Sequence, residues 1–116
     1  MRRGDIYLVD FGQSRRNFEF GKNRPAVIVQ TDKLNFAIEE EIYDYVIVAP
    51  LSTREDIVTE EFRYKLLPRN DLYEESYVVC NSLCFLHKKY LKKKLVSLRD
   101  HEIEEINEIL RSVLEL

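Results

Sequence analysis

The sequence is poor in the residues on which several classes of site depend. Its 116 residues include only two cysteines, two histidines and three glycines. Two cysteines exclude the disulfide framework that small secreted domains use. Together with two histidines they also make a poor metal site. We therefore expect Cys80 and Cys84 to be buried free thiols, and we expect neither a metal nor another cofactor.

Long apolar segments are also missing. No run of apolar residues approaches the roughly 20 that a membrane-spanning helix requires. The first five residues turn acidic at once and lack the apolar core of a signal peptide. With 116 residues and 45% hydrophobic composition, the chain is long enough for one domain, residues 1–116, with its own core. The expectation is a soluble, cytoplasmic, single-domain protein without membrane association.

Familiar catalytic motifs are absent as well. The sequence has no Walker-type phosphate loop, no glycine triplet and no H-x-x-x-H pattern. His87 precedes a lysine run and His101 lies near the start of a predicted helix, so nothing brings them together as an acid–base pair. Cys80 and Cys84 fall in an apolar stretch without a neighbouring base. Histidine-pair and cysteine-nucleophile chemistry are therefore not expected.

Charge is distributed unevenly along the chain, although the net charge is only −3. Acidic residues gather at 39–41 and at 100–108, whereas basic residues form two groups. The basic groups are Arg2, Arg3, Arg15, Arg16, Lys22 and Arg24, and later Lys88, Lys89, Lys92, Lys93 and Lys94. Two interpretations remain open: a basic face for nucleic acid, or solvated edges whose lysines keep a sheet from pairing with other sheets.

The hydrophobic pattern predicts a mainly β domain. Apolar and alternating stretches predict strands at 6–11, at 26–30, at 43–53 with an end at Pro50, near 62–66, and one or two within 76–86, with a kink at Asn81–Ser82. The segment 31–41 is predicted to be a connection or a short helical turn. Residues 12–23 form a loop too long for a tight hairpin, and such loops are often functional.

The C-terminal segment changes its period. Ile103, Ile106 and Leu110 lie on one helical face. Ser97 and Asp100, in an S-x-x-D spacing, predict the start of that helix. The sequence therefore predicts a small antiparallel β domain closed by one C-terminal α-helix.

Three polar residues have related positions in this scheme. Arg24 begins one strongly predicted strand, and Ser52 and Thr53 end another. If the two strands are antiparallel neighbours, these side chains meet at one rim of the sheet. A guanidinium and a hydroxyl there would bind phosphate, and such fixed donors would stabilise the charge that develops when a 2′-OH cleaves RNA. The alternative is an ion pair of Arg24 with Glu19 and a turn-capping role for Ser52.

Four stretches of the chain resemble successive blocks of the MazF/PemK family of toxins. They are "RRGDIYLVDFG", "EFGKNRPAVIVQ", "YVIVAPLST" and the segment from "SYVVCNSLC" through "LKKKLVSLRDHEIEEINEIL". The resemblance covers nearly the whole chain, in order and at ordinary spacing. It implies a small SH3-like β-barrel with a C-terminal helix, usually a homodimer. It also implies a toxin of a toxin-antitoxin system: a metal-independent, sequence-selective endoribonuclease that cleaves single-stranded RNA such as mRNA and is neutralised by a small antitoxin.

The resemblance also implies roles for individual residues. Arg24 matches the family's catalytic arginine, which acts in proton transfer and charge stabilisation. Ser52 matches the hydroxyl residue that holds the phosphate, with Thr53 as a second candidate. The implied products are a 2′,3′-cyclic phosphate and a 5′-hydroxyl. The loop around Glu19, Gly21 and Lys22 would border the RNA groove, and the lysines from Lys88 and Lys89 onward would add phosphate contacts.

The sequence departs from the family pattern after the serine-tyrosine pair. Asn81, Ser82, Leu83 and Cys84 stand where aspartate, glutamine, a hydrophobic residue and arginine are common, and Tyr90 stands where an arginine is common. These departures leave two alternatives open. One is a non-catalytic toxin of the same fold class that binds DNA gyrase through its C-terminal helix. The other is a degenerate member that binds antitoxin or RNA without cutting.

Overall fold

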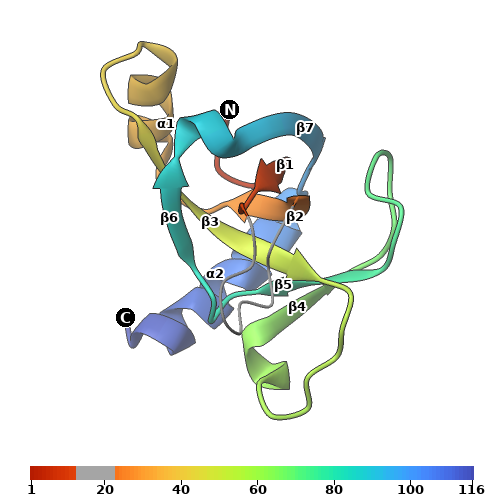
Figure 1. The fold of residues 1–116 in the computed structure, drawn as a ribbon. Coiled ribbons are helices and arrows are strands. Elements are labelled where there is room, and N and C mark those ends of the chain that lie inside the picture. The colour runs from red at the N-terminus through yellow and green to blue at the C-terminus, as the bar shows by residue number, and fades with distance from the viewer. Residues whose placement is uncertain (13–22) are drawn as a thin grey trace.

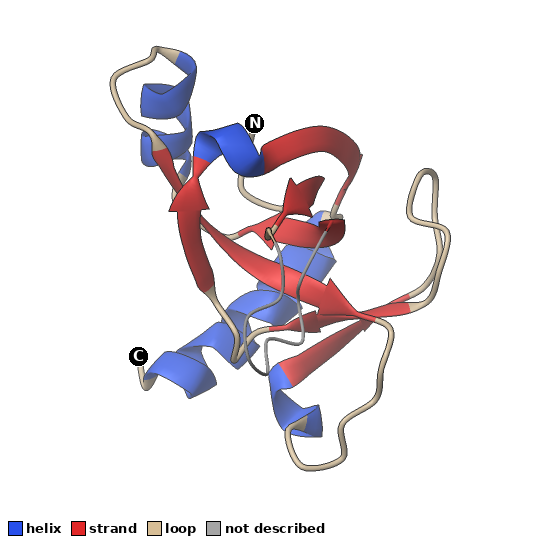
Figure 2. Cartoon of the chain, in the orientation of Figure 1, coloured by secondary structure: helices blue, strands red, loops and turns tan. Residues whose placement is uncertain are grey.

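The computed structural model describes residues 1–12 and 23–116 and contains strands, two α-helices and two short 3₁₀ helices (Figures 1 and 2). In chain order the elements are β1 (Asp5–Asp10), β2 (Asn23–Ile28), α1 (Asp32–Glu39), β3 (Tyr45–Ser52), η1 (Glu60–Phe62), β4 (Arg63–Leu66), β5 (Ser76–Val79), β6 (Cys84–His87), η2 (Lys88–Tyr90), β7 (Leu91–Ser97) and α2 (Asp100–Leu114).

All strand pairs are antiparallel and belong to one curved sheet in the order β4-β5-β3-β2-β1-β7, with β6 paired to β3. β3 is its centre: β2 lies on one side, and β6 and then β5 lie on the other. Within the described ranges no ladder joins β4 to β7, so the sheet curves like a barrel but stays open (Figure 1). The predicted mainly antiparallel β fold with a C-terminal helix is confirmed.

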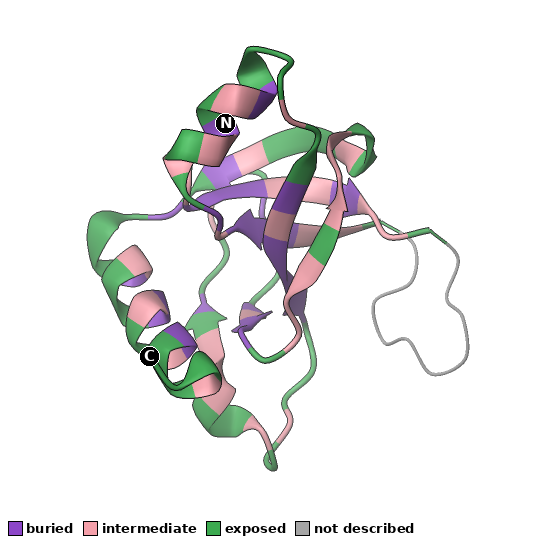
Figure 3. Ribbon diagram, turned by 90° about the vertical axis from the view of Figure 1, so that its left-hand side faces the viewer, coloured by how far each residue is buried: buried purple, intermediate pink, exposed green. Residues whose placement is uncertain are grey.

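The core has two parts because the sheet is covered on both faces. On one face, Ile106 and Leu110 of α2 pack with Ile6 and Val78. On the other face, Ile38 of α1 belongs to a cluster with strand residues such as Val9, Ile28 and Val48. Figure 3 shows the buried residues of α2 on the side turned toward the sheet. β3 is buried on both faces, which explains its continuous apolar run in the sequence.

Several predicted strand ends are wrong, including those of the two central strands. β3 does not stop at Pro50 but continues to Ser52. Proline removes one backbone donor, yet Leu51 and Ser52 find new partners in β5, opposite Val78 and Tyr77, so the pairing continues. β2 begins at Asn23 rather than at Arg24, because its ladder with β1 extends to the pair Asp10–Asn23.

The helices also refine the expectations. The segment predicted as a connection or short helical turn contains the eight-residue helix α1, whose Lys33 N–H bonds the Thr31 hydroxyl at 3.3 Å. The predicted start of α2 at Ser97 is wrong, because Ser97 ends β7 and its hydroxyl donates to Asp5 Oδ1 at 2.8 Å. Instead, the Arg99 N–H donates to Glu102 Oε1 at 2.8 Å in the first turn.

The two thiols are both free, but they are buried to different degrees. Cys80 is fully buried after β5, and burial raises the pKa of its thiol to about 12. Cys84 opens β6 and is half-buried, and burial raises its pKa too. The expectation of a buried thiol is thus confirmed in full for Cys80 and in part for Cys84. In the described ranges, α1 and α2 are each too short or too polar to cross a membrane.

Candidate functional site

β2 and β3 are antiparallel neighbours, as predicted. Their ladder pairs Ala26 with Pro50 and Ile28 with Val48. The ladder ends at Ala26–Pro50, and because antiparallel strands run in opposite directions, Arg24 of β2 and Ser52 of β3 both lie beyond this end of it. The beginning of one strand and the end of the other therefore lie at one rim of the sheet.

A cavity of about 530 Å³ opens at this rim. Its lining comes from β1, β2, the end of β3 with Thr53 after it, the segment between β4 and β5, the start of β5, and β7. The lining residues are Leu8, Asn23, Arg24, Pro25, Leu51, Ser52, Thr53, Asp71, Leu72, Tyr73, Glu74, Ser76, Lys93 and Leu95. All three candidates predicted to share a site, Arg24, Ser52 and Thr53, therefore line the same cavity.

The two hydroxyl residues differ in their surroundings. The side chain of Ser52 is buried, and its Oγ accepts the backbone N–H of Arg54 at 3.1 Å. This is the turn contact that a purely structural role would require. A serine hydroxyl can accept one hydrogen bond and donate another, so the turn contact by itself does not conflict with a phosphate contact. Thr53 is exposed and follows directly after the strand.

Lys93 is a second cation at the cavity, and sequence reasoning did not distinguish it from its neighbours. Leu8 pairs with Pro25 on one side and with Lys93 on the other, so these three residues lie at one level across the sheet. Lys93 and Leu95 line the cavity, whereas Lys94 forms an ion pair with Asp5 at 3.5 Å. The half-buried Arg24 and the exposed Lys93 thus form the basic side of the cavity.

The remaining predicted binding residues are not brought to this cavity by the described structure. Glu19, Gly21 and Lys22 lie outside the described residues, and so does an ion pair of Arg24 with Glu19. Lys88 and Lys89 belong to η2 and do not line the cavity. Lys88 Nζ lies 3.4 Å from Asp44 Oδ1, and Lys89 Nζ lies 5.2 Å from the centre of the Tyr90 ring.

The residues that depart from the family pattern also lie elsewhere. Asn81 and Ser82 are in the turn between β5 and β6, and Cys84 opens β6. Leu83 lines a different groove beside α2, and Tyr90 ends η2. None of them is among the residues that line the cavity of Arg24 and Ser52.

The segment between β4 and β5 supplies a wall that sequence reasoning missed. Asp71, Tyr73 and Glu74 all line the cavity from this side. No local pattern marks them, because only the folding of distant strands brings them to the cavity that Arg24 lines. With Arg24 and Lys93 on one side and two carboxylates on the other, the cavity has a basic side and an acidic side. The basic side, with the Ser52 hydroxyl, suits a phosphate group.

Comparisons with known proteins give a consistent result. Residues 2–114 match the model of a family described as PemK-like, MazF-like toxin of type II toxin-antitoxin system. The chain is 33% identical over 111 residues to the endoribonuclease MazF of Staphylococcus saprophyticus, covering 92% of this chain and 85% of that protein.

Solved structures show the same fold. An endoribonuclease in complex with its cognate antitoxin, from a mycobacterial species, superposes with a TM-score of 0.76 at 22% identity, covering 100% of this chain and 96% of that chain. MazF from Deinococcus radiodurans superposes with a TM-score of 0.75 at 16% identity, covering 100% and 97%. At these identities the likeness concerns the fold alone.

Proposed function

The chain belongs to the PemK-like, MazF-like toxins of type II toxin-antitoxin systems, and from this premise we propose that it is an endoribonuclease. Its substrate is single-stranded RNA such as mRNA, and its reaction needs no metal ion. The 33% identity to an endoribonuclease over most of both chains supports the activity. Action on mRNA would take place in the cytoplasm.

One observation carries the proposal: Arg24 and Ser52, from different strands, line one cavity together with Lys93. In the reaction the 2′-oxygen of a ribose bonds to the adjacent phosphorus while the bond from phosphorus to the 5′-oxygen breaks. The 2′-OH loses its proton and the leaving 5′-oxygen gains one. The products are a 2′,3′-cyclic phosphate and a 5′-hydroxyl.

Each residue has a role in that step. Negative charge grows on the phosphoryl oxygens in the transition state, and donors already fixed in place stabilise it without reorganising. Arg24 offers a rigid fork of N–H donors for this charge, and the family resemblance implies that it takes part in the proton transfer. Ser52 donates to a phosphoryl oxygen. Single-stranded RNA is favoured because attack by the 2′-OH needs an in-line geometry that a regular duplex denies.

A small antitoxin is the proposed inhibitor, and a homodimer is the proposed assembly. A mycobacterial relative of the same fold has been solved with its cognate antitoxin. An acidic peptide that folds as it binds fits a cavity with Arg24 and Lys93 on one side. Because RNA phosphate needs the same cations, we expect antitoxin and RNA to compete for the site.

The test is incubation of the pure protein with a long single-stranded RNA in excess EDTA, followed by mapping of the new ends. We expect discrete cuts that leave 5′-hydroxyl ends, and we expect the loss of cutting in Arg24→Ala. Arg111→Ala is the matched control, because Arg111 is an exposed arginine of α2 that does not line this cavity. Absence of cutting by the wild-type protein across several RNAs would contradict the proposal and favour a binding-only toxin, with gyrase as the next target to test.

A further inference from the structure

The cavity of Arg24 and Ser52 has a side that the cleavage reaction does not use. This side is the β4–β5 loop, residues 67–75, which projects beyond the ends of the two strands (Figure 1). Asp71, Tyr73 and Glu74 of this loop are exposed and line the cavity. Tyr73 is 78% exposed, which is unusual for a large aromatic side chain at the rim of a cavity.

The loop is tied down on both sides of Tyr73. Arg69 and Leu72 exchange two backbone hydrogen bonds of 2.8 Å, and the Leu72 side chain is buried in the core. On the other side, the Ser76 hydroxyl donates to the Glu74 carbonyl oxygen at 3.0 Å. The exposed ring of Tyr73 is therefore presented by an anchored segment.

The chemistry of this wall differs from that of the basic side. The Tyr73 hydroxyl donates to Asp71 Oδ1 at 3.4 Å, so the Asp71 carboxylate lies beside the Tyr73 side chain. Two carboxylates repel phosphate and orient an RNA backbone toward Arg24 and Lys93. An exposed aromatic ring stacks on a nucleobase, and a carboxylate accepts hydrogen bonds from an exocyclic amino group such as N4 of cytosine.

We propose that the β4–β5 loop is the nucleobase subsite of this cavity. Tyr73 stacks on the base next to the phosphate held by Arg24, and Asp71 and Glu74 accept hydrogen bonds from that base. The subsite favours a base with an exocyclic amino group over uracil, which presents a carbonyl oxygen at the corresponding position. This inference rests on the proposed ribonuclease function, which it extends to the choice of base.

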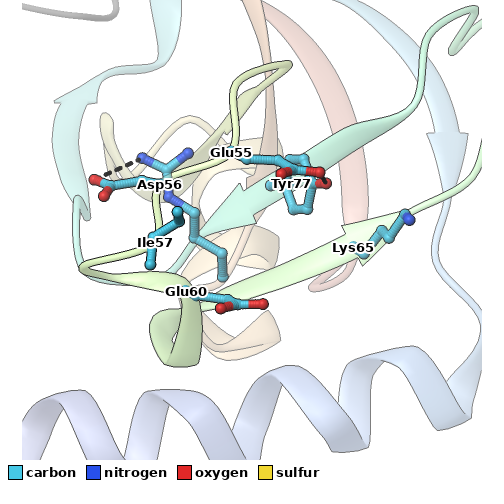
Figure 4. A pocket seen from close by; sticks show the side chains of 7 residues that line it. Glu55, Asp56, Ile57, Glu60, Lys65 and Tyr77 are labelled. Atoms are coloured by element: carbon cyan, nitrogen blue, oxygen red, sulfur yellow. Dashed lines mark hydrogen bonds and ion pairs between the residues drawn. The ribbon is translucent and has the colours of Figure 1, made fainter.

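Tyr77 provides a matched control on the same segment of the chain. Ser76 lines the cavity, whereas Tyr77, the next residue of β5, is not among its lining residues. Tyr77 accordingly lines a separate pocket with Glu55, Asp56 and Arg63, and its hydroxyl donates to Glu55 Oε1 at 2.9 Å (Figure 4). Tyr77→Ala therefore removes an equally large aromatic ring that does not line the cavity, and it keeps the backbone pairing of Tyr77 with Ser52.

The binding test uses short single-stranded oligodeoxycytidine and oligodeoxyuridine, which lack the attacking 2′-OH. Their bases differ at C4, where cytosine has an amino group and uracil a carbonyl oxygen, and at N3, which carries a proton only in uracil. We expect the wild-type protein to bind oligodeoxycytidine more tightly. Tyr73→Ala should weaken that binding by about tenfold, within the range of one lost stacking contact. Tyr73→Phe and Tyr77→Ala should bind like the wild type, and Asp71→Asn should reduce the preference for cytosine over uracil.

Each result decides between the two proposals. Equal binding of both oligonucleotides, no binding of either, or unchanged binding by Tyr73→Ala would overturn the base subsite. Because these probes are not cleaved, such a result says nothing about the ribonuclease proposal, which the RNA cleavage assay tests separately. Conversely, a cytosine preference that depends on Tyr73, in a protein that cuts no RNA, would sustain the subsite and overturn the cleavage function. In an active enzyme, Tyr73→Ala should raise KM more than it lowers kcat.

Discussion

Arg69 of the β4–β5 loop donates a hydrogen bond of 2.6 Å from its guanidinium to Oε1 of Glu102 in α2. The same carboxylate oxygen accepts the Arg99 N–H at 2.8 Å, so one buried group closes the first turn of α2 and anchors the loop. The Glu102 side chain is 5% exposed and that of Arg69 is 16% exposed. The terminal helix thereby holds in place the loop that forms one wall of the cavity.

The first prediction concerns this pair. Burial of the Glu102 carboxyl acts to raise its pKa, but the hydrogen bonds from Arg69 and Arg99 outweigh it and hold the pKa below the usual value. Glu102→Gln should lower the free energy of unfolding by roughly 3 kcal/mol at neutral pH, because it leaves the Arg69 charge partly buried without its partner.

The effect of Glu102→Gln should depend on pH. A group whose pKa is lowered by folding stabilises the protein above its unfolded pKa, about 4.3 for glutamate, and loses that effect as the pH falls through the folded value. The difference between wild type and Glu102→Gln in denaturant titrations should therefore shrink on acidification below that pH. Glu104→Gln, at an exposed position of α2, is the control. If the difference in unfolding free energy between wild type and Glu102→Gln stays constant with pH, the pKa of Glu102 is not lowered by folding and the prediction is wrong.

The second prediction concerns Gly4, which has a φ of +94°. A Cβ at this position would lie 2.5 Å from Ile103 Cδ1 of α2. Gly4→Ala should lower the unfolding free energy by about 2 kcal/mol, combining backbone strain with overpacking. Adding Ile103→Val, which removes Cδ1, should recover part of the loss.

A comparison with Gly12 distinguishes backbone strain from overpacking against Ile103. Its φ is +76°, but among the residues that the structure describes a Cβ there would meet nothing within 4 Å. Gly12→Ala should therefore show the strain alone and lower the unfolding free energy by about 1 kcal/mol. Equal losses for the two alanine variants in thermal or denaturant unfolding would show that the contact with Ile103 contributes nothing.

The third prediction decides between the two candidate hydroxyl groups. Ser52 ends β3 with a buried side chain at the cavity, whereas Thr53 is exposed beyond the strand. Ser52→Ala should lower kcat for RNA cleavage by about 100-fold, as for the loss of one fixed donor to the transition state. Thr53→Ala should remain close to wild type. The opposite order in single-turnover cleavage would transfer the role to Thr53.

The fourth prediction concerns Lys93 within the lysine run. Lys93 lines the cavity and Lys92 does not, although the two lysines are neighbours on β7 and both are exposed to solvent. Lys93→Ala should weaken RNA binding and reduce the slope of log K against log salt by about 0.7, the value for one contact with a single strand. Lys92→Ala should change the slope much less. Equal slopes for both variants would contradict a specific role of Lys93 and show that the lysines act only as a general basic surface.

Much of the local structure follows from the sequence. The β-branched run at 26–30 and the apolar run at 43–53 predict two central strands, which the structure contains with different ends, and the period of Ile103, Ile106 and Leu110 predicts the terminal helix. These assignments are correct because alternation and helical period depend on near neighbours in the chain. The shared position of Arg24 and Ser52 also follows, since it requires only that two adjacent strands be antiparallel.

The tertiary structure alone decided the rest of the cavity. A shift of one residue in strand register turns every side chain to the other face, and the β1–β7 pair contains two such shifts. The sequence therefore identifies a lysine run but does not identify Lys93 as the lysine at the cavity. Similarly, Asp71 and Tyr73 line the same cavity as Arg24 only because β5 pairs with the end of β3 and Arg69 is bound to α2. Sequence determined the strands, the helix and the two central residues, while register and long-range contacts determined which side chains surround them.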